Sequence, residues 1–399
     1  MSVRPQVSKP TVFHFIWCIP HYRIPIFRRL SQHPQMTFEV CAGSNSNIGG
    51  GKRLACVVKP EQAEGIRWCL LRSYRLGRWE WQPGAVWKML KESPDAVICH
   101  GFFCLSNWIV RLICKLRRIP VLDWTQGVKR PEKGIRWWLA DLYYRQADAI
   151  LFYGNFARDY FIKKGYPAKK LFVVYNSLDY DTQKLVLESI TPEAAARCRI
   201  EFGVVNPEDR LIINSSRLER GKQIDLLIRA VAMLKQMGHR VYAVLVGDGQ
   251  ERSALETLAR ELSVADRVRF FGACYQEDKL GLLFAAADVC VMPGPVGLIA
   301  MHCLVYGTPL LTCENSQGRH GPEIETIVEG KTGRFFRQGD AADLAEKMKQ
   351  MLYPIPCKEH MSAACMDIID RYYTPQYQEK VILEALNSVL PKDKQIINS

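Results

Sequence analysis

Residues 241–262 read VYAVLVGDGQERSALETLAREL, and this stretch contains the unit from which the chain is built. Its first six residues are apolar or aromatic, which predicts a buried strand at Val241–Val246. Gly247-Asp-Gly249 then signals a turn, and the spacing of the following apolar residues predicts a helix at Glu251–Leu262. Successive units of this kind form a parallel sheet that is covered by helices on both faces.

The same unit recurs in both halves of the chain. In the N-terminal half, the pattern predicts strands at Thr11–Trp17, Thr37–Ala42, Asp95–Cys99, Pro120–Trp124, Ala149–Phe152 and Leu171–Val174, and helices near Pro25 and at Gly84–Lys91, Asn107–Leu116 and Gly134–Gln146. In the C-terminal half, it predicts further strands at Leu211–Asn214, Arg267–Phe271, Val289–Met292 and Pro309–Thr312, and helices at Ile224–Met237, Glu277–Ala286, Leu298–Tyr306, Ala341–Met351 and Thr374–Leu390. We therefore expect an α/β protein with two Rossmann-like domains in tandem.

The chain has 399 residues, whereas single hydrophobic cores rarely grow beyond roughly 250 residues. Between Asp179 and Asp209 the repeating pattern gives way to polar sequence with a short helical piece, where we expect the linker. The expected domains are therefore residues 1–185 and residues 186–373. A last helix, within residues 374–399, is expected to pack back towards the N-terminal domain.

The formal net charge of +13 predicts an acidic partner: a phosphate compound, an anionic lipid surface or a nucleic acid. Nucleic acid is the least favoured, because no helix-turn-helix, RNA-binding or zinc-finger signature is present. The 14 cysteines are scattered without a Cys-x-x-Cys pair, so we expect reduced thiols and no bound metal. No window of about 18 apolar residues appears and residues 1–10 are polar, which favours a cytoplasmic protein, either free or peripheral on the inner membrane face.

Four strand ends in the C-terminal half carry unusual residues, at the edge where ligands of such sheets bind. Arg217 and Lys222 flank a turn that precedes a helix, which suits a diphosphate but is equally compatible with a solvated basic loop. Gly247-Asp-Gly249 is first of all a strand-to-helix turn. The strand at Arg267–Phe271 presents a backbone edge to a nucleobase, or it belongs only to the core.

The fourth strand end is the loop Pro293-Gly-Pro-Val-Gly297, which continues through Leu298 into a helix. Its prolines and glycines make a rigid loop, and the backbone N–H groups of Val296, Gly297 and Leu298 can point at an anion at the start of the helix. His302 lies one helical turn beyond Leu298 and can face the same crevice, although a histidine in an apolar helix is more often a core residue.

In this order and at this spacing, these segments resemble the C-terminal domain of retaining family 4 glycosyltransferases of the GT-B type, and the resemblance covers nearly the whole chain. The matching segments are Ser-Ser-Arg217-Leu-Glu-Arg-Gly-Lys222, Val-Gly247-Asp-Gly249, Val268–Gly272, Gly297-Leu298 to Gly307-Thr-Pro309, and Pro322-Glu323 to Gly330-Lys-Thr-Gly333. The resemblance implies two Rossmann-like domains facing a central cleft, with a nucleotide-diphosphate sugar bound by the C-terminal domain.

The resemblance also implies roles for single residues. Arg217 and Lys222 are implied to bind the donor diphosphate and to stabilise the departing nucleotide. The backbone around Phe270 and Phe271 is implied to read the base, and the turn at Gly247 to line the same donor site.

The amides of Val296–Leu298 are implied to lie over the distal phosphate, and His302 stands where the family has a Glu that binds the ribose hydroxyls. The chain departs from the family here, because the family's Glu-x7-Glu pair is absent and the loop before Gly297 is shorter. A His can still hydrogen-bond a ribose hydroxyl. Glu323 and Glu325 on the next loop are hypothetical replacements for the missing sugar contact.

In the N-terminal domain, the family often has a His before a Gly near the donor sugar, and this chain has Gln126 before Gly127. Gln126 can hydrogen-bond the sugar but cannot carry a proton. A retaining displacement does not require a protein base, because the leaving phosphate can take the acceptor proton. His100, at the end of the preceding strand, is a second catalytic candidate, or it only caps a loop.

The N-terminal domain of this architecture usually binds the acceptor. His21, Tyr22 and Arg23 follow the first strand and are candidate acceptor contacts, and His14 is expected to face the same crevice. The stretch from Ile66 to Trp81 interleaves four arginines with Trp and Tyr. It suits a lipid headgroup boundary, or it is a solvated basic helix that packs its aromatic rings inward.

These features favour a metal-independent hexosyltransferase that uses a nucleotide sugar, needs no cofactor and glycosylates, with retention, a saccharide or lipid-linked saccharide in polysaccharide or glycoconjugate assembly. The missing Glu pair and Gln126 leave a second possibility open, a nucleotide-sugar-binding or partner-binding protein with impaired catalysis. A nucleotide-sugar epimerase of the same fold is a third. Dinucleotide oxidoreduction is disfavoured, because no Gly-x-Gly-x-x-Gly follows the first strand.

Overall fold

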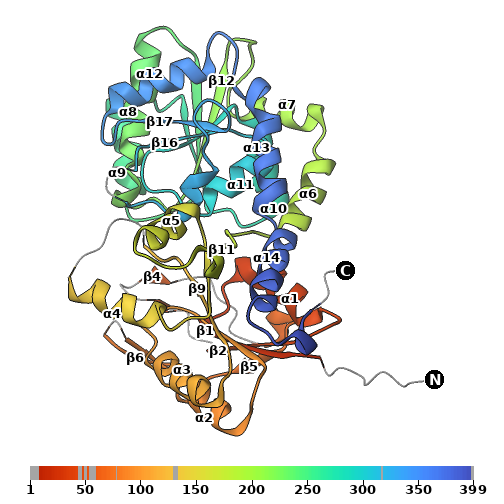
Figure 1. Ribbon diagram of the computed structural model, residues 1–399. Coiled ribbons are helices and arrows are strands. Elements are labelled where there is room, and N and C mark those ends of the chain that lie inside the picture. Colours follow the sequence, from red (N-terminus) through yellow and green to blue (C-terminus); the bar gives the residue numbers. More distant parts are fainter. Residues whose placement is uncertain are drawn as a thin grey trace. The chain divides into compact units, whose positions relative to one another are not determined.

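The computed structural model describes residues 9–43, 47–48, 52–53, 60–77, 79–128, 134–315 and 318–396. The chain forms two compact units (Figure 1). The first consists of Met1–Asp179 and Thr374–Ser399, and the second of Tyr180–Tyr373. The sequence pattern favours a slightly later boundary, after residue 185, because it treats the polar stretch beyond Asp179 as a linker.

The first unit is built on a parallel sheet of seven strands in the order β11-β10-β9-β8-β1-β2-β5. The strands are β1 (Thr11–Cys18), β2 (Thr37–Gly43), β5 (Trp68–Leu70), β8 (Ala96–Cys99), β9 (Val121–Thr125), β10 (Ala149–Phe152) and β11 (Leu171–Val173). The helices are α1 (Ile24–Gln32), α2 (Pro83–Lys91), α3 (Leu105–Arg117), α4 (Ile135–Tyr144), α5 (Asn155–Lys163) and α14 (Pro375–Asn387). Two antiparallel pairs of short strands are added, β3 (Asn47–Ile48) with β4 (Lys52–Arg53) and β6 (Tyr74–Leu76) with β7 (Trp79–Trp81).

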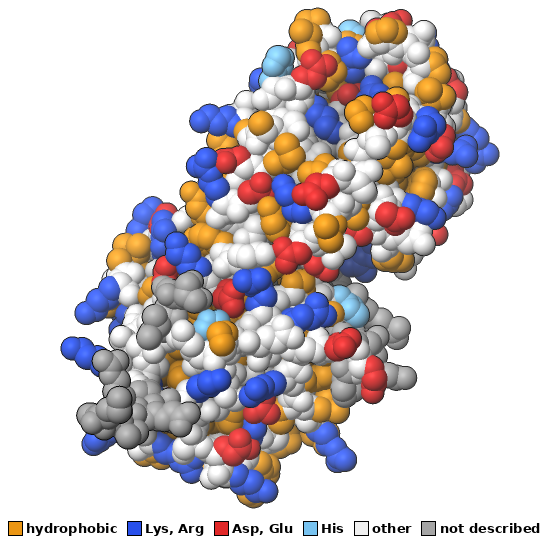
Figure 2. Space-filling view, turned by 90° about the vertical axis from the view of Figure 1, so that its right-hand side faces the viewer, with side chains coloured by type: hydrophobic (Ala, Val, Ile, Leu, Met, Phe, Trp, Pro, Cys, Tyr) orange, Lys and Arg blue, Asp and Glu red, His pale blue; other side chains and the backbone are white. Residues whose placement is uncertain are grey.

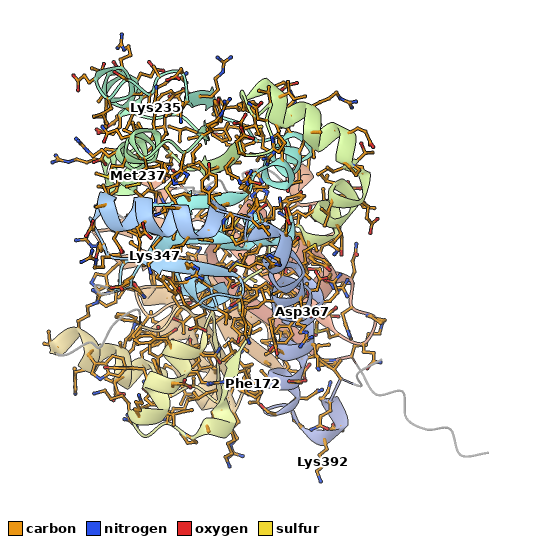
Figure 3. All side chains as sticks on the ribbon, turned by 90° about the horizontal axis from the view of Figure 1, so that it is seen from above. Phe172, Lys235, Met237, Lys347, Asp367 and Lys392 are labelled. Atoms are coloured by element: carbon orange, nitrogen blue, oxygen red, sulfur yellow. The ribbon has the colours of Figure 1, made fainter. Side chains whose placement is uncertain are left out.

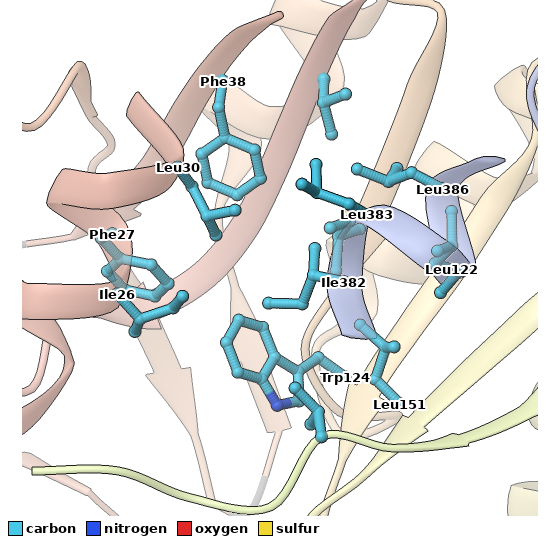
Figure 4. Packing of buried hydrophobic residues seen from close by; sticks show 14 of the residues in the cluster. Ile26, Phe27, Leu30, Phe38, Leu122, Trp124, Leu151, Ile382, Leu383 and Leu386 are labelled. Atoms are coloured by element: carbon cyan, nitrogen blue, oxygen red, sulfur yellow. The ribbon is translucent and has the colours of Figure 1, made fainter. Parts of the chain in front are cut away.

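Helices cover both faces of this sheet and bury its apolar residues. On one face α1 and α14 pack against the strands, and Figure 4 shows Ile382 and Leu386 of α14 beside Leu122, Trp124 and Leu151. On the other face α2 and α3 enclose a separate apolar cluster. The C-terminal helix α14 is therefore part of the core of the first unit.

The second unit contains a parallel sheet of six strands in the order β14-β13-β12-β15-β16-β17, which is the Rossmann order. The strands are β12 (Arg210–Ser215), β13 (Val241–Val246), β14 (Val268–Gly272), β15 (Val289–Met292), β16 (Leu310–Cys313) and β17 (Gly333–Phe336). The helices are α6 (Tyr180–Ser189), α7 (Pro192–Glu201), α8 (Ile224–Gln236), α9 (Arg252–Glu261), α10 (Glu277–Ala286), α11 (Ile299–Val305), α12 (Ala341–Leu352) and α13 (Lys358–Tyr372). Apolar residues of α8 and α12 share one core cluster with the strands, and Figure 3 labels Lys235 and Met237 at the end of α8 and Lys347 on α12.

The polar stretch after Asp179 is more ordered than the sequence predicts. It forms two helices, α6 and α7, and both belong to the second unit. Pro192 occupies the first position of α7, and the hydroxyl of Thr191 accepts a hydrogen bond from the amide of Ala194. The predicted linker with a short helical piece is therefore wrong for residues 180–201. The sequence prediction also lacks the helices α5 and α13, the strand β17 and the short strands β3 to β7.

Candidate functional site

The strand order of the second unit reverses at β12, with β13 on one side and β15 on the other, so the switch point of the sheet lies between β12 and β15. Ligands of doubly wound sheets bind at this point. Two loops leave it: residues 216–223 after β12, with the short helix η4 (Arg220–Lys222), and residues 293–298 after β15. The loops touch, because a Cβ atom on Gly294 would lie 2.7 Å from both the carbonyl oxygen of Gly221 and Cα of Lys222.

Arg217 and Lys222 belong to the first of these loops. The guanidinium of Arg217 is exposed and lies 3.1 Å from a carboxylate oxygen of Glu219. The Nζ atom of Lys222 donates a hydrogen bond of 2.8 Å to the carbonyl oxygen of Pro295, so it reaches the second loop. Two cations beside a switch point can neutralise a diphosphate.

Gly247 and Gly249 follow β13 and pack against the loop that carries Arg217. A Cβ atom on Gly247 would lie 1.9 Å from the carbonyl oxygen of Ser216, and the φ angle of Gly247 is 140°. A Cβ atom on Gly249 would lie 2.4 Å from the carbonyl oxygen of Leu218. Both positions therefore require glycine, and this turn holds the backbone next to Arg217.

The loop after β15 differs from the prediction at one amide. The N–H group of Val296 donates a hydrogen bond of 3.2 Å to Nδ1 of His320, which is buried. This amide therefore faces the protein interior, and the expectation that it points at a phosphate is wrong for this structure. Within the described ranges, no acceptor contacts the amides of Gly297 and Leu298.

Glu323 lies against the same loop. It belongs to the short helix η5 (Pro322–Thr326) and is 5% exposed. A Cβ atom on Gly321 would lie 2.1 Å from Oε2 of Glu323 and 3.4 Å from Cα of Gly297. The structure thus brings the carboxylate of Glu323 close to the Gly297 loop, whereas Glu325 is half-buried on the same short helix.

His302 lies on α11 and faces α10. Its Nε2 atom is 2.8 Å from Oε1 of Glu277, and the hydroxyl of Tyr306 donates a hydrogen bond of 2.6 Å to the same oxygen. Burial raises the pKa of Glu277, but hydrogen bonds from His302, Tyr306 and Gln183 outweigh this effect and leave the pKa below its ordinary value. Because an ionised carboxylate only accepts, Nε2 of His302 carries a proton and donates it to the hydrogen bond with Glu277. In the neutral imidazole, Nδ1 is then a hydrogen-bond acceptor. The sequence pattern did not indicate Glu277.

Phe270 and Phe271 belong to β14, which is an edge strand of the described sheet. Phe271 is 41% exposed, and its ring centroid lies 6.3 Å from that of Phe202. The guanidinium of Arg252 lies 6.0 Å from the centroid of the Phe270 ring. An open strand edge beside an exposed aromatic ring can contact a planar base. That the backbone around Phe270 and Phe271 reads the base stays a prediction.

Gln126 and His100 follow β9 and β8 of the first unit. Gln126 is exposed. His100 is half-buried, and its enclosed Nδ1 atom has no partner in the part of the chain that the structure describes. Burial, and after it the charge of Arg23, holds the pKa of His100 well below its ordinary value. A histidine with so low a pKa is neutral but is a weak base.

His21, Tyr22 and Arg23 form the short helix η1 directly after β1. His21 is exposed, Tyr22 is half-buried and Arg23 is only 4% exposed. His14 lies within β1, is fully buried and packs 5.4 Å from Phe27 between ring centroids. The expectation that His14 faces an open crevice is therefore wrong.

The basic, Trp-rich stretch forms the strands β5, β6 and β7 and not a helix; Arg78 lies outside the described residues. Arg75 lies 5.7 Å from the centroid of the Trp17 ring and 3.4 Å from a carboxylate oxygen of Glu80. On the face shown in Figure 2, Lys and Arg side chains are spread over the surface and do not gather in one patch. None of the described helices combines the length and apolar character that crossing a membrane requires.

Three possible metal ligands meet elsewhere in the first unit. Side-chain oxygen and sulfur atoms of Glu39 and Cys41 on β2 and of Cys69 on β5 lie within 4.8 Å of one another. A carboxylate oxygen of Glu39 is 2.9 Å from Nζ of Lys88, so it already has a cationic partner. No short motif in the sequence indicates this group, because its members come from two separate strands.

Comparison with known proteins gives matches in both units. The family model described as "Glycosyl transferases group 1" matches residues 200–361, and the model described as "Glycosyl transferase 4-like domain" matches residues 39–177. The chain is 34% identical over 145 residues to the lipopolysaccharide core biosynthesis glycosyltransferase LpsE of Rhizobium meliloti. The aligned segment covers 36% of this chain and 39% of LpsE. It is 26% identical over 238 residues to the GDP-mannose-dependent alpha-(1-6)-phosphatidylinositol monomannoside mannosyltransferase of Mycolicibacterium smegmatis. This alignment covers 57% of each chain. The matched segments thus span less than two thirds of either relative.

A solved structure extends the likeness to both units. The Anabaena protein HepE in complex with UDP matches with a TM-score of 0.70 and 19% identity, over 95% of this chain and 100% of HepE. The fold is that of a GT-B glycosyltransferase. The 4-like match falls within the first unit and the group 1 match within the second, so each GT-B domain corresponds to one compact unit. The second GT-B domain is therefore the one that carries Arg217, Lys222 and the Gly297 loop at its switch point.

Proposed function

We propose that this GT-B glycosyltransferase moves a sugar from a nucleotide-diphosphate sugar to a saccharide or lipid-linked saccharide in polysaccharide or glycoconjugate assembly. The observation that carries the proposal is the pair of cations Arg217 and Lys222 at the switch point of the second unit, with Lys222 in contact with the 293–298 loop. The names of the matched relatives, a lipopolysaccharide glycosyltransferase and a mannosyltransferase, support it. So does the UDP in the HepE structure.

In the proposed reaction, the bond between the anomeric carbon and the diphosphate breaks, and negative charge develops on the leaving phosphate. Arg217 exchanges Glu219 for a phosphate oxygen, and Lys222 exchanges the carbonyl of Pro295 for another. Each hydrogen bond from a charged group contributes about 1.5–3 kcal/mol. Because two cations supply the charge that this leaving group needs, we propose a metal-independent reaction without a cofactor.

We assign the acceptor proton to the leaving phosphate, which is compatible with retention at the anomeric carbon. Gln126 cannot carry a proton, and the pKa of His100 lies well below its ordinary value because of burial and the charge of Arg23. Neither residue is therefore suited to the role of general base. We propose that Gln126 and His100 act as hydrogen-bonding contacts within the reaction site.

The donor contacts beyond the phosphates follow from the hydrogen bonds at His302 and Glu323. With Nε2 of His302 donating to Glu277, the Nδ1 atom is the acceptor for a ribose hydroxyl. The carboxylate of Glu323, close to Gly297, is proposed to accept from a sugar hydroxyl. If the double substitution Glu323→Gln, Glu325→Gln leaves the Michaelis constant for the donor unchanged, this sugar contact is wrong.

A thermal-shift panel of UDP, GDP, ADP and CMP tests the central claim, because a ligand of the native state raises its stability by an amount that grows with the logarithm of its affinity. We expect at least one nucleoside diphosphate to raise the melting temperature of the wild type, and Lys222→Met to abolish the shift. The donor found in this way is then offered with candidate acceptors. No shift with any of the four nucleotides would remove the basis of the proposal.

A second candidate function is nucleotide-sugar binding without transfer. The observation that favours it is His302, which replaces a family carboxylate and is already engaged by Glu277. Release of the nucleotide in the presence of acceptor, measured with the donor identified above, separates the two functions. Transfer to any acceptor excludes the binding protein, and donor conversion without an acceptor would favour an epimerase.

Binding at an anionic membrane surface is a further part of the proposal. Leu70 and Tyr74 are 55% and 52% exposed on either side of the exposed Arg72, so apolar and basic groups lie together at the surface. Flotation with anionic vesicles at low salt tests it. We expect the wild type to float and Arg72→Glu to float less, and no flotation at low salt would contradict the idea.

A further inference from the structure

Three arginines are buried among the described residues, and two of them have oxygen partners. Arg111 pairs with the carboxylate of Asp123, and Arg210 donates to backbone carbonyls, including that of Leu352 at 2.8 Å. Arg23 is equally buried, yet its Nε and Nη1 atoms have no hydrogen-bond partner in the described chain. A buried guanidinium with two donors unpaired and no described carboxylate beside it is unfavourable, which indicates that an acceptor binds there.

The surroundings of Arg23 contain further unpartnered polar groups. Its guanidinium carbon lies 4.7 Å from the ring centroid of Trp124 and 5.0 Å from that of Tyr153. The indole Nε1 atom of Trp124 and the hydroxyl of Tyr153 are enclosed and also lack a partner among the described residues. Both aromatic residues stand at the carboxyl ends of strands in the parallel sheet, and Arg23 follows β1 at the same edge.

Two histidines complete this cluster without adding charge. The ring of His14 lies 5.6 Å from that of Trp124 and 6.4 Å from that of His100, between centroids. Burial, and after it the charge of Arg23, lowers the pKa of His14 to about 3, and the same causes hold the pKa of His100 well below its ordinary value. Both imidazoles are therefore neutral near pH 7, and each offers one N–H donor and one acceptor. The positive charge of the cluster comes from Arg23.

We propose that Arg23, His100, Trp124 and Tyr153 form a binding site for an oxyanion, a phosphate or a carboxylate, that the acceptor carries, with the buried His14 packed against Trp124. The guanidinium fork presents parallel N–H donors to such a group, and the indole and phenol donors complete its contacts. Water can satisfy these hydrogen bonds, but it cannot balance the buried charge. That the oxyanion belongs to the acceptor rests on the proposed function, whereas the anion site itself does not.

The test uses the full chain with inorganic phosphate as the probe. The melting temperature is measured in rising sodium phosphate, against sodium chloride at equal ionic strength, for the wild type, Arg23→Met and Lys222→Met. Lys222→Met is the matched control, because it removes a cation at which phosphate can bind in the second unit. At ten times its dissociation constant, phosphate should raise the melting temperature of the wild type by about 3 to 6 °C. Lys222→Met should keep most of this shift, and Arg23→Met should lose it.

Further measurements keep the test decisive. Without phosphate, Arg23→Met should melt no lower than the wild type, because it removes an unbalanced buried charge. Arg23→Lys should keep part of the phosphate shift, and it serves in place of Arg23→Met if that variant does not fold. Sodium acetate in a parallel series distinguishes a carboxylate site from a phosphate site.

The proposal is overturned if neither anion gives a shift that depends on Arg23, or if Lys222→Met loses the shift and Arg23→Met keeps it. UDP in the same samples tests the proposed function separately, since its effect should depend on Lys222 and not on Arg23. A chain that binds phosphate through Arg23 but responds to no nucleotide would retain the anion site and refute the donor site.

Discussion

The substitution Gly294→Ala tests whether direct backbone contact positions the loops at residues 216–223 and 293–298. The added Cβ atom would lie 2.7 Å from three backbone atoms: the carbonyl oxygens of Gly221 and Lys222 and Cα of Lys222. Ordinary contact begins near 3.4 Å, so the loops would have to separate by about 0.7 Å (3.4 − 2.7). No side chain can rotate away to relieve the overlap. Overpacking of this kind costs about 1–3 kcal/mol.

The displacement would move the turn that carries Lys222 away from Pro295, to which its Nζ atom now donates at 2.8 Å. Loss of one charged hydrogen bond to the diphosphate costs about 1.5–3 kcal/mol. The affinity for the nucleotide should therefore fall about 10- to 150-fold. In a domain of this size, 1 kcal/mol corresponds to about 2–4 °C, so the melting temperature should fall by about 2–12 °C.

Isothermal calorimetry with the nucleotide that gives the largest thermal shift measures the affinity, and differential scanning fluorimetry measures the stability. Gly221→Ala is the matched control, because a Cβ atom there meets no atom within 4 Å and the φ angle of Gly221 is not positive. It should leave both quantities unchanged. The reasoning fails if Gly294→Ala binds the nucleotide as tightly as the wild type, or if Gly221→Ala weakens binding equally.

Four other substitutions test the electrostatics of the two units. Lys222→Met should weaken nucleotide binding about 10- to 150-fold in calorimetry. Glu219→Gln should not weaken it, since this change only releases the guanidinium of Arg217. Equal losses in the two variants would contradict the assignment of Lys222 to the diphosphate. Glu277→Gln should lower the melting temperature at pH 7 but not near pH 3. Because the pKa of Glu277 is lower in the folded state, its carboxylate stabilises the fold above the unfolded pKa, and this stabilisation is lost as pH falls through the folded pKa. Glu80→Gln should show the opposite pH dependence. Burial raises the pKa of Glu80 to about 7, so the protonated side chain contributes stability below the unfolded pKa, and this contribution is lost as pH rises through 7. This variant should therefore melt higher than the wild type at pH 8 and like the wild type near pH 4. A lower melting temperature at pH 8 would show that the ion pair with Arg75 outweighs the cost of burial.

The regular elements of the fold could be predicted where the hydrophobic period is strong. The strand at Val241–Val246 and the helix at Glu277–Ala286 are found at the predicted bounds. Helix α7 was missed because only Cys198 is buried on it, so it shows no apolar stripe. Strand β17, at Gly333–Phe336, contains Gly and Arg and buries only its first and last residues, so it lacks the apolar run of the other four-residue strands.

The site could be predicted only where its residues lie close together in the sequence. Arg217 and Lys222 share one short loop, so the sequence indicates them directly. The amide of Val296 donates to His320, which comes from a later loop, and no local pattern predicts that contact. The same holds for Arg23, because its lack of a partner depends on what surrounds it in the folded unit.

In the proposed donor site, the replacement of a carboxylate by His302 changes charge more than it changes hydrogen bonding. Glu277 fixes the proton on Nε2 of His302, so Nδ1 remains an acceptor for a hydroxyl, as a carboxylate oxygen would be. The negative charge stays on Glu277, one hydrogen bond further from the ligand. Repulsion between this charge and the diphosphate therefore decreases, while Arg217 and Lys222 remain. Nucleotide binding should thus persist without the family's Glu pair. The loss of these carboxylates instead changes the hydrogen bonds that the site offers to the hydroxyls of the sugar.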